Sequence, residues 1–305
     1  MRDAACGSAA QVTRRASMQS YLTIRALADP AYRPDAFALY AYFRWLDDEV
    51  DEHLATAAEC AALVARERQL LEAAAGDTPL PGFGACRQER LLVGLLRCPD
   101  GTPRGDAAGA RLALASMLDV MAFDATRRGR SVTAAELDDY THTLAVAVTE
   151  ALHHCIGHGT GSPHDASRYV AVTRAHVAHM LRDLRRDVVD GYVNVPAEIL
   201  AAGVSPDEPD SAAFRAWVRE RVDLARGCFG AGRAYLARLD SARCRLAGHA
   251  YIARFEWVLD AIEREGYRLR ERYPERSSLR GGLAIGSAAL RSAAAARDLH
   301  PVGGR

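Results

Sequence analysis

The sequence predicts an all-α protein built as one helical bundle. Apolar residues recur at three- and four-residue spacing from one end of the chain to the other, whereas the alternating pattern of a half-buried strand is almost absent. Strong helix formers such as Ala, Leu, Arg and Glu dominate the composition. Clusters of Pro and Gly interrupt the periodic segments, as they do where helices end.

The helices are expected between these clusters. Asp29-Pro30 closes the first helix, and further boundaries fall at 77–84, 99–105, 157–163 and 205–209. One periodic segment is too long for a single helix of a globular protein, so we expect a break near His53. In chain order the expected helices are 17–27, 34–74 with that break, 87–96, 107–127, 133–156, 165–189, 211–239 and 242–273.

A chain of 305 residues allows one large domain or two small ones. No internal repeat is evident, and no linker is long enough to separate two domains. We therefore expect a single domain over residues 17–297. Residues 1–16 and 298–305 are expected to be flexible tails.

The charged residues exclude several functions. All 39 basic residues are Arg and none is Lys, which excludes Schiff-base chemistry and a P-loop lysine. Acidic residues also number 39, so the formal net charge is zero and nothing in it favours a nucleic-acid partner.

The seven cysteines are scattered and never form a C-x-x-C pair, which is typical of thiols in an intracellular protein. The N-terminus lacks the apolar run of a secretory signal, so we expect a cytoplasmic protein. The most apolar stretch, 281–290, is too short to cross a bilayer. It could still rest against one, which would be a peripheral membrane contact.

An unusual concentration of acid falls on the second expected helix. Five of the six residues from Asp47 to Glu52 are Asp or Glu. On a helix, Tyr40, Arg44, Asp47 and Asp51 fall within about 60° of one another, with Asp48 beside them. Like charges on one face repel unless a cation lies between them, and all-oxygen ligands indicate Mg²⁺. The alternative is a solvated acidic helix end.

A second acidic cluster lies on a later helix. Asp183 and Asp187 are four residues apart on one face, with arginines interleaved and Asp190 one turn on. Surface salt bridging would explain this cluster alone. Two such clusters facing each other across a bundle would instead hold Mg²⁺ around a diphosphate, while arginines bind its oxygens. The candidate arginines are Arg25, Arg44, Arg182, Arg185 and Arg186.

These segments together resemble the squalene and phytoene synthases, from about Ser17 to Tyr273. Residues 20–25 are similar to the family's first diphosphate-contacting segment, Tyr40 to Asp51 to its first aspartate-rich motif, and Arg182 to Pro196 to its second. Weaker matches are 121–124, the helix around Tyr140, and Tyr251. The resemblance implies the class I isoprenoid synthase fold, an all-α bundle around a central active-site cavity.

The resemblance also implies the chemistry and the residues that perform it. Two or three Mg²⁺ ions would bind with the diphosphate of an allylic substrate, and an allylic cation would then form in a dry cavity. The candidate wall residues of this cavity are Tyr21, Tyr40, Phe43 and Tyr140. The implied metal ligands are Asp47, Asp48, Asp51, Asp183 and Asp187. The implied diphosphate-binding residues are Ser20, Tyr21, Arg25, Arg44, Arg182, Arg186 and Tyr251.

The chain departs from the family pattern in three places. A Gln-x-x-Asn pair that usually precedes the second motif is His176 and His179 here, and the usual Gly-Arg-x-Tyr-Leu-Pro has become Gly191 to Pro196 with Tyr192 and Asn194. Glycines that usually follow Tyr140 are missing. On the helical wheel both histidines share a face with Asp183 and Asp187. Neutral imidazole accepts protons near neutral pH, although a buried histidine is often a packing residue.

The histidines favour one function over its alternative. We expect transfer of a prenyl group to a carbon of a non-isoprenoid, aromatic acceptor of secondary metabolism, because alkylating an aromatic ring requires removal of its proton. The expected catalytic residues are His176, His179, Tyr40 and Asp187. The alternative is the family's head-to-head condensation of two C15 or C20 prenyl diphosphates. A third reading is an inactive subunit that binds prenyl diphosphates.

Two further features have weaker readings. His153, His154 and His158 could form a zinc site with Cys155, although the first two point to different helix faces. The glycines at 157, 159 and 161 match a dinucleotide loop only weakly, because they end a helix and do not follow a strand. A helix stop is the simpler reading.

Overall fold

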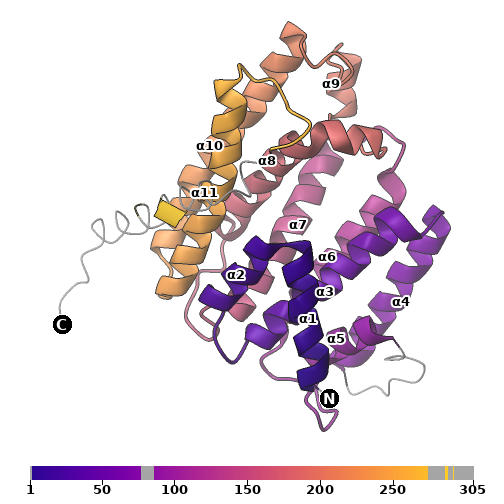
Figure 1. The fold of residues 1–305 in the computed structure, drawn as a ribbon, viewed down its shortest axis with the longest axis vertical. Helices are drawn as coiled ribbons and strands as arrows, with labels where there is room; N and C mark the ends of the chain where they lie inside the picture. The colour runs from indigo at the N-terminus through magenta and orange to yellow at the C-terminus, as the bar shows by residue number, and fades with distance from the viewer. Residues whose placement is uncertain (1, 77–85, 274–285, 288–290, 292–305) are drawn as a thin grey trace. The chain divides into compact units, whose positions relative to one another are not determined.

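The computed structural model describes the backbone of residues 2–76, 86–273, 286–287 and 291, and side chains from residue 9 onward. Regular structure in these residues consists of eleven α-helices and one π-helical turn, and the only bridge between extended segments joins Arg97 to Pro103. Figure 1 shows this arrangement. The all-α prediction is confirmed.

The elements are α1 (Arg2–Ala16), α2 (Met18–Leu27), α3 (Arg33–Asp48), η1 (Glu49–His53), α4 (Ala57–Ala75), α5 (Arg87–Leu96), α6 (Ala108–Arg127), α7 (Ala134–Cys155), α8 (Ser167–Val189), α9 (Ala197–Ala201), α10 (Ala212–Ala237) and α11 (Ala242–Arg264).

Most expected helices appear with ends shifted by a few residues. The break expected near His53 is present as the π-helical turn η1, after which Thr56 and Glu59 form a capping box that starts α4. The helix expected to reach residue 273 ends at Arg264, because Gly266 and Tyr267 adopt positive φ angles of 63° and 65°. The short helix α9 is an addition to the expected set.

The chain divides into two compact units, Met1–Thr126 with Val146–Gly159, and Arg127–Ala145 with Thr160–Arg305. The first contains α1 to α5 and α6 except its last residue, and the second contains α8 to α11. The single domain over 17–297 and the central cavity stay predictions, and residues 298–305 lie outside the described part of the chain.

The N-terminal helix α1 belongs to the core of the first unit. It packs on α2, α3 and α5. Ala9 is buried with Phe37, Ala41 and Leu91, and Thr13 is fully buried with its hydroxyl bonded to the Ala9 carbonyl at 2.9 Å. The expectation that residues 1–16 form a flexible tail is therefore wrong, because an amphipathic stretch there buries side chains against α3.

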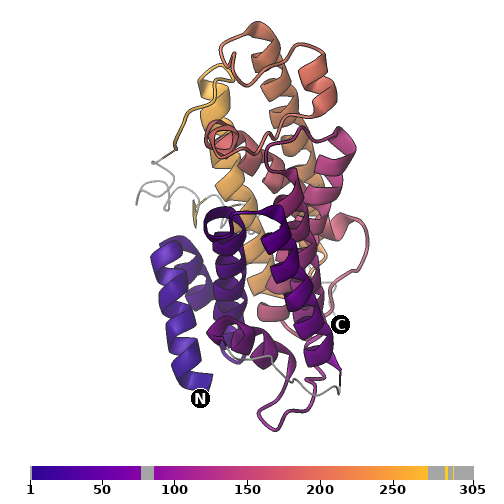
Figure 2. The same cartoon turned by 90° about the vertical axis from the view of Figure 1, so that its right-hand side faces the viewer.

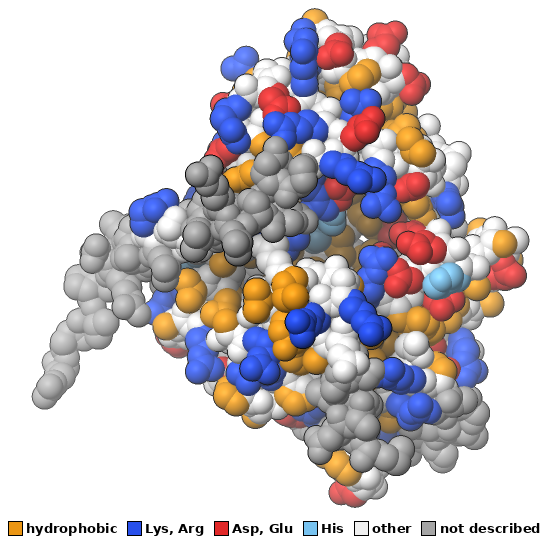
Figure 3. Space-filling model, in the orientation of Figure 1, with side chains coloured by type: hydrophobic (Ala, Val, Ile, Leu, Met, Phe, Trp, Pro, Cys, Tyr) orange, Lys and Arg blue, Asp and Glu red, His pale blue; other side chains and the backbone are white. Residues whose placement is uncertain are grey.

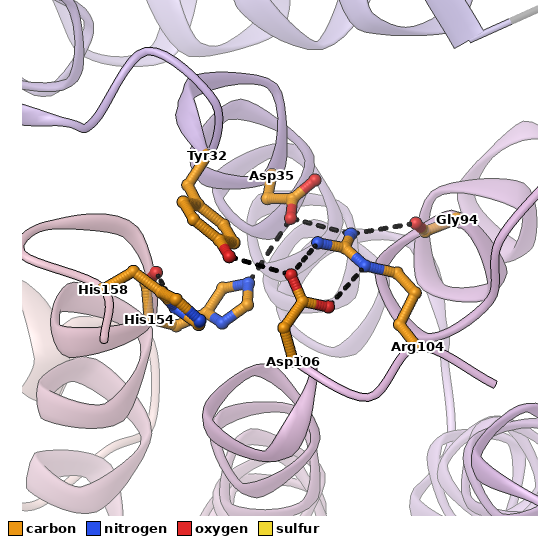
Figure 4. Close-up of polar contacts among 7 residues, drawn as sticks. All are labelled: Tyr32, Asp35, Gly94, Arg104, Asp106, His154 and His158. Atoms are coloured by element: carbon orange, nitrogen blue, oxygen red, sulfur yellow. Dashed lines mark hydrogen bonds and ion pairs between the residues drawn. The ribbon is translucent and has the colours of Figure 1, made fainter.

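A polar cluster between α3, α7 and the segment before α6 ties the first unit together (Figure 4). Arg104 donates to Asp35 at 2.8 Å and to both oxygens of Asp106 at 3.0 and 3.1 Å. The Tyr32 hydroxyl donates to Asp106 at 2.9 Å, and its ring stacks on His158 at 4.0 Å. Arg104 and Asp35 are nearly buried, with 11% and 13% of their side chains exposed. Such a buried network stabilises the fold only while every charge keeps its partner.

A second buried polar pair lies between α3 and α4. The Tyr42 hydroxyl donates to Glu67 at 2.8 Å, and both residues are almost fully buried. Burial raises the pKa of Glu67 from 4.5 to about 7, with the neighbouring Glu89 adding to the rise and the Tyr42 hydrogen bond opposing it. Glu67 therefore carries its proton in the folded state at pH values where the unfolded chain has lost it.

This shift predicts a pH-dependent contribution to stability. Because the pKa is raised on folding, the stabilising contribution is complete below about pH 4.5 and is lost as the pH rises to about 7. Glu67→Gln mimics the protonated acid. The difference in free energy of unfolding between this variant and the parent protein should therefore shift in favour of the variant by about 2 kcal/mol from acidic to mildly alkaline pH. Thermal melts of both proteins at about pH 5.5 and about pH 8.5 measure this difference. A difference that does not grow with pH would contradict the assignment.

The second unit is built on α8. This helix packs against α10 and α11, and α10 and α11 run side by side in both ribbon views (Figures 1 and 2). Phe214, Trp217 and Phe229 of α10 are buried in the core of this unit. Gly232 of α10 permits a close approach to α8, since a Cβ there would lie 2.4 Å from the Cβ of Ala171.

That close approach predicts opposite effects for two alanine substitutions on one helix. Gly232→Ala should destabilise the protein by about 2 kcal/mol, because the short Ala171 side chain cannot turn away from the added methyl group. Gly230→Ala is the matched control, since a Cβ there meets nothing within 4 Å and alanine favours the helix by up to about 1 kcal/mol. Urea unfolding measures both. Equal effects would contradict the packing described.

Arginine and acidic side chains are interspersed on the face shown in Figure 3. Within the described part of the chain, no helix has the length and apolarity needed to cross a membrane. The apolar stretch 281–290, on which the expected membrane contact depends, lies mostly outside the described residues.

Candidate active site

The first aspartate segment ends α3 in the first unit. Asp47 and Asp48 occupy its last turn, Arg44 lies one turn earlier, and Asp51 comes next in η1. Arg44 donates to Asp47 at 3.0 Å and also pairs closely with Asp48. From the expected stripe of Tyr40, Arg44, Asp47 and Asp51, the structure pairs Arg44 with Asp47, and it also pairs Arg44 with the neighbouring Asp48.

Asp47 titrates unlike an ordinary aspartate. Burial raises its pKa to about 6, and the charges of Asp51, Asp124 and Asp48 add to the rise while Arg44 opposes it. Asp124 comes from α6 and is 7% exposed. Three further carboxylates thus act on Asp47, and a bound cation relieves such repulsion. Asp124 was absent from the predicted ligands, although it ends one of the weakly matching segments.

The second aspartate segment lies on α8 in the second unit. Asp183 accepts hydrogen bonds from Arg182, whose Nε is at 2.6 Å, and lies 2.9 Å from His179 Nε2. Burial alone would raise its pKa, but Arg182 and His179 outweigh burial and hold the pKa well below its usual range. Asp183 is therefore ionised at any working pH.

Asp187, one turn further, behaves in the opposite way. Burial and the nearby charge of Asp183 raise its pKa to about 7. Its Oδ2 accepts a hydrogen bond from Asn194 at 2.8 Å, and Asn194 in turn accepts one from Arg127 at 2.7 Å. Neither Asn194 nor Arg127 was among the predicted site residues.

The two histidines before this motif differ in environment. His176 is 6% exposed, and within the described residues neither ring nitrogen has a hydrogen-bond partner. Burial lowers its pKa to about 3, so the imidazole is neutral. Its ring centroid lies 6.3 Å from that of His179, which pairs with Asp183. The predicted common face of His176, His179 and Asp183 is thus present on α8.

Tyr251 of α11 lies near the same face of α8. Its ring packs on Phe255 at 5.1 Å, and burial raises its pKa to about 12 although the charges of Arg254 and Arg182 oppose the rise. Arg254 was missed, although its spacing of three residues from Tyr251 places both on one helix face. Together these residues form an arginine-rich site in the second unit.

The other predicted site residues have local contacts or are exposed. Tyr21 packs on Phe37 at 5.6 Å, and the backbone N–H of Ser20 donates to the side chain of Ser17, which caps α2. Tyr40 is half-buried on α3, and Arg25 is exposed at the end of α2. Arg186 pairs with Asp190 at 3.4 Å, and 78% of its side chain is exposed. Whether any of these residues contacts a diphosphate stays a prediction.

The carboxylates fit magnesium held jointly with a phosphate group. Within the described residues, no three His, Cys, Asp or Glu side chains gather closely enough to hold a metal ion alone. Magnesium, however, is usually bound by one or two carboxylates with water and substrate phosphates completing its octahedron. Each segment supplies such oxygens. The zinc site proposed for His153, His154, His158 and Cys155 finds no such support, because His154 pairs with Asp35 and His158 bonds to its own helix.

Comparison with models of protein families identifies the family of this chain. The model described as squalene/phytoene synthase matches residues 13–280. The chain belongs to the squalene/phytoene synthase family. No curated protein matches the sequence closely enough to count as a relative.

Solved structures agree with this family on the fold. A dehydrosqualene synthase in complex with a ligand has a TM-score of 0.73 at 16% identity, covering 95% of this chain and 97% of that one. Squalene synthase HpnC from Alicyclobacillus acidocaldarius has a TM-score of 0.67 at 19% identity over 88% and 97%. TcSQS with the ligand BPH1237 has a TM-score of 0.71 at 15% identity over 99% and 94%.

Membership in the squalene/phytoene synthase family bears on the choice between the two predicted functions. The family, described as squalene/phytoene synthase, favours condensation of prenyl diphosphates over transfer to an aromatic acceptor. The aromatic acceptor, which depended on His176 and His179, has no support from these comparisons.

Proposed function

We propose that this chain joins two allylic prenyl diphosphates head to head, in a magnesium-dependent reaction that releases diphosphate. The observation that carries the proposal is the second motif of a squalene/phytoene synthase chain, in which Asp183 is kept ionised by Arg182 and His179. An ionised carboxylate beside arginines is suited to hold a cation and the oxygens of a leaving group at one place.

The residues of α8 and α11 would perform the binding steps. Arg182 and Arg254 offer guanidinium groups near Tyr251, whose raised pKa keeps its hydroxyl a hydrogen-bond donor. On α8, Asp183 and Asp187 would bind the metal. In the first unit, Asp47 and Asp48 are the candidate metal ligands. When bound, magnesium neutralises the developing charge of the departing diphosphate.

The buried His176 would act later in the reaction. The cation left after carbon–carbon bond formation is a strong acid, so even a weakly basic neutral imidazole can accept its proton. The C–H electron pair would then form the alkene, and the imidazole would carry the proton away. This step suits a product that ends in deprotonation, and no nicotinamide site is proposed.

The test is to incubate the purified chain with Mg²⁺ and separate dimethylallyl, geranyl, farnesyl and geranylgeranyl diphosphates, without another substrate. Mass spectrometry of the organic extract should show a C30 or C40 hydrocarbon. Bound diphosphate without any product from any substrate would contradict the proposal and favour an inactive binding subunit.

A second candidate remains because one observation favours it. The neutral imidazole of His176, which has no hydrogen-bond partner among the described residues, could equally take a ring proton from an aromatic acceptor. In that case no hydrocarbon forms, and a prenylated product appears only when an aromatic metabolite is added to a short prenyl diphosphate. His176→Gln should then impair transfer while binding of the diphosphate is retained.

A further inference from the structure

The segment after the second motif carries the side chain that controls Asp187. Gly191 has a φ of 92°, which lets the chain turn back past the end of α8. Its carbonyl accepts the backbone N–H of Gly129 at 2.8 Å, and Arg128 donates to the Asp190 carbonyl at 3.2 Å. The two residues that follow α6 thus bond to this segment, and Asn194 lies against the carboxylate of Asp187.

Asn194 is buried between a cation and a carboxylate. It is 5% exposed, and its Oδ1 accepts from Arg127 while its Nδ2 donates to Asp187. A guanidinium can only donate, so the amide oxygen must face Arg127. The amide nitrogen must then face Asp187, which fixes the orientation of the amide without ambiguity.

Arg127 is itself held in place. It is 7% exposed, and its guanidinium lies 4.7 Å from the ring centroids of both Tyr140 and Tyr192. Tyr192 stands where the resembling motif has arginine, and Asn194 stands where that motif has tyrosine. In this chain the guanidinium groups of Arg127, at the end of α6, and of the following Arg128 lie over the ring of Tyr192, which occupies the substituted position.

We propose that Arg127 and Asn194 are positioning residues for Asp187: Arg127 orients the Asn194 amide, and this amide holds Oδ2 of Asp187 so that Oδ1 is presented to the metal–diphosphate complex. The inference rests on the proposed function, because it assumes that Asp187 binds such a complex. Partners that hold a ligating carboxylate commonly change metal affinity 10- to 100-fold when they are removed.

The experiment measures binding of inorganic pyrophosphate to the full chain in the presence of Mg²⁺ by calorimetry. Asn194→Leu, which keeps the volume and removes both hydrogen bonds, should weaken binding about 10-fold or more. Asn194→Ser is the second variant, because its small hydroxyl side chain is compatible with folding yet cannot span Asp187 and Arg127. Arg130→Gln is the control and should leave binding unchanged, since Arg130 pairs with Glu136 at 2.8 Å and 40% of its side chain is exposed.

Three outcomes separate the possibilities. Weaker binding by the Asn194 variants, with melting temperatures close to that of the parent, supports the proposal. Unchanged binding with a lowered melting temperature would mean that Asn194 is structural only, and would overturn it. Absence of pyrophosphate binding in the parent protein would instead remove the proposed function and this inference with it.

Discussion

Asp183→Asn should lower product formation on the order of a thousandfold. The carboxylate accepts from Arg182 and lies against His179, so it carries a full negative charge that a metal–diphosphate complex needs. Asparagine has nearly the same shape, but it is neutral and turns an N–H₂ group toward one of these donors. The loss should appear in turnover, measured by product formation under saturating Mg²⁺. Asp47→Asn is expected to behave alike in the first unit.

The control for this variant is Asp190→Asn on the same helix end. Asp190 is about half exposed, and it forms an ion pair with the exposed Arg186 at 3.4 Å. Such a surface pair contributes little. Activity of Asp190→Asn should stay within about threefold of the parent. Substantial activity in Asp183→Asn would remove the metal-binding role assigned to α8.

Arg104→Leu should destabilise the first unit by about 3–5 kcal/mol. The substitution leaves Asp35 and Asp106 without the guanidinium that neutralises both, and Asp35 is nearly buried (Figure 4). It also removes the arrangement in which Arg104 and Tyr32 together hold the pKa of Asp106 far below its usual range. For a protein of this size the melting temperature should fall by roughly 10 °C.

Arg111→Leu is the matched control. Arg111 forms one ion pair with Glu72 at 3.0 Å, and more than half of each side chain is exposed. Its loss should cost less than about 1 kcal/mol. Equal losses for Arg104→Leu and Arg111→Leu, measured by thermal and urea unfolding, would contradict the view that the polar cluster holds the unit together.

The sequence was sufficient for features that depend on helical periodicity. The break near His53 follows from the length of the periodic segment, and the common face of His176, His179 and Asp183 follows from its regular spacing. Both are present. The expectation of a tail over the first sixteen residues was wrong, because the burial of Ala9 depends on side chains of α3, which the local pattern does not reveal.

Features that depend on burial and on where a side chain points could not be predicted. Asp183 and Asp187 look equivalent in the sequence, but their pKa values move in opposite directions because Arg182 folds back on the first and burial dominates at the second. Asn194 and Arg127 are 67 residues apart, and no local pattern brings them together. The signal available in the sequence was the departure from the family motif, in which Asn194 occupies a position that usually holds tyrosine.

The π-helical turn Glu49–His53 makes the register of the first aspartate segment sensitive to the number of residues in it. In this turn the Leu54 N–H bonds to the Glu49 carbonyl at 2.9 Å, five residues back, so the ring contains one residue more than an α-helical ring. Losing one residue there would restore the ordinary ring and rotate the later residues of the segment by about 100° relative to Asp47. An insertion or deletion within the turn before Asp51 would therefore move Asp51 off the face that it shares with Asp47.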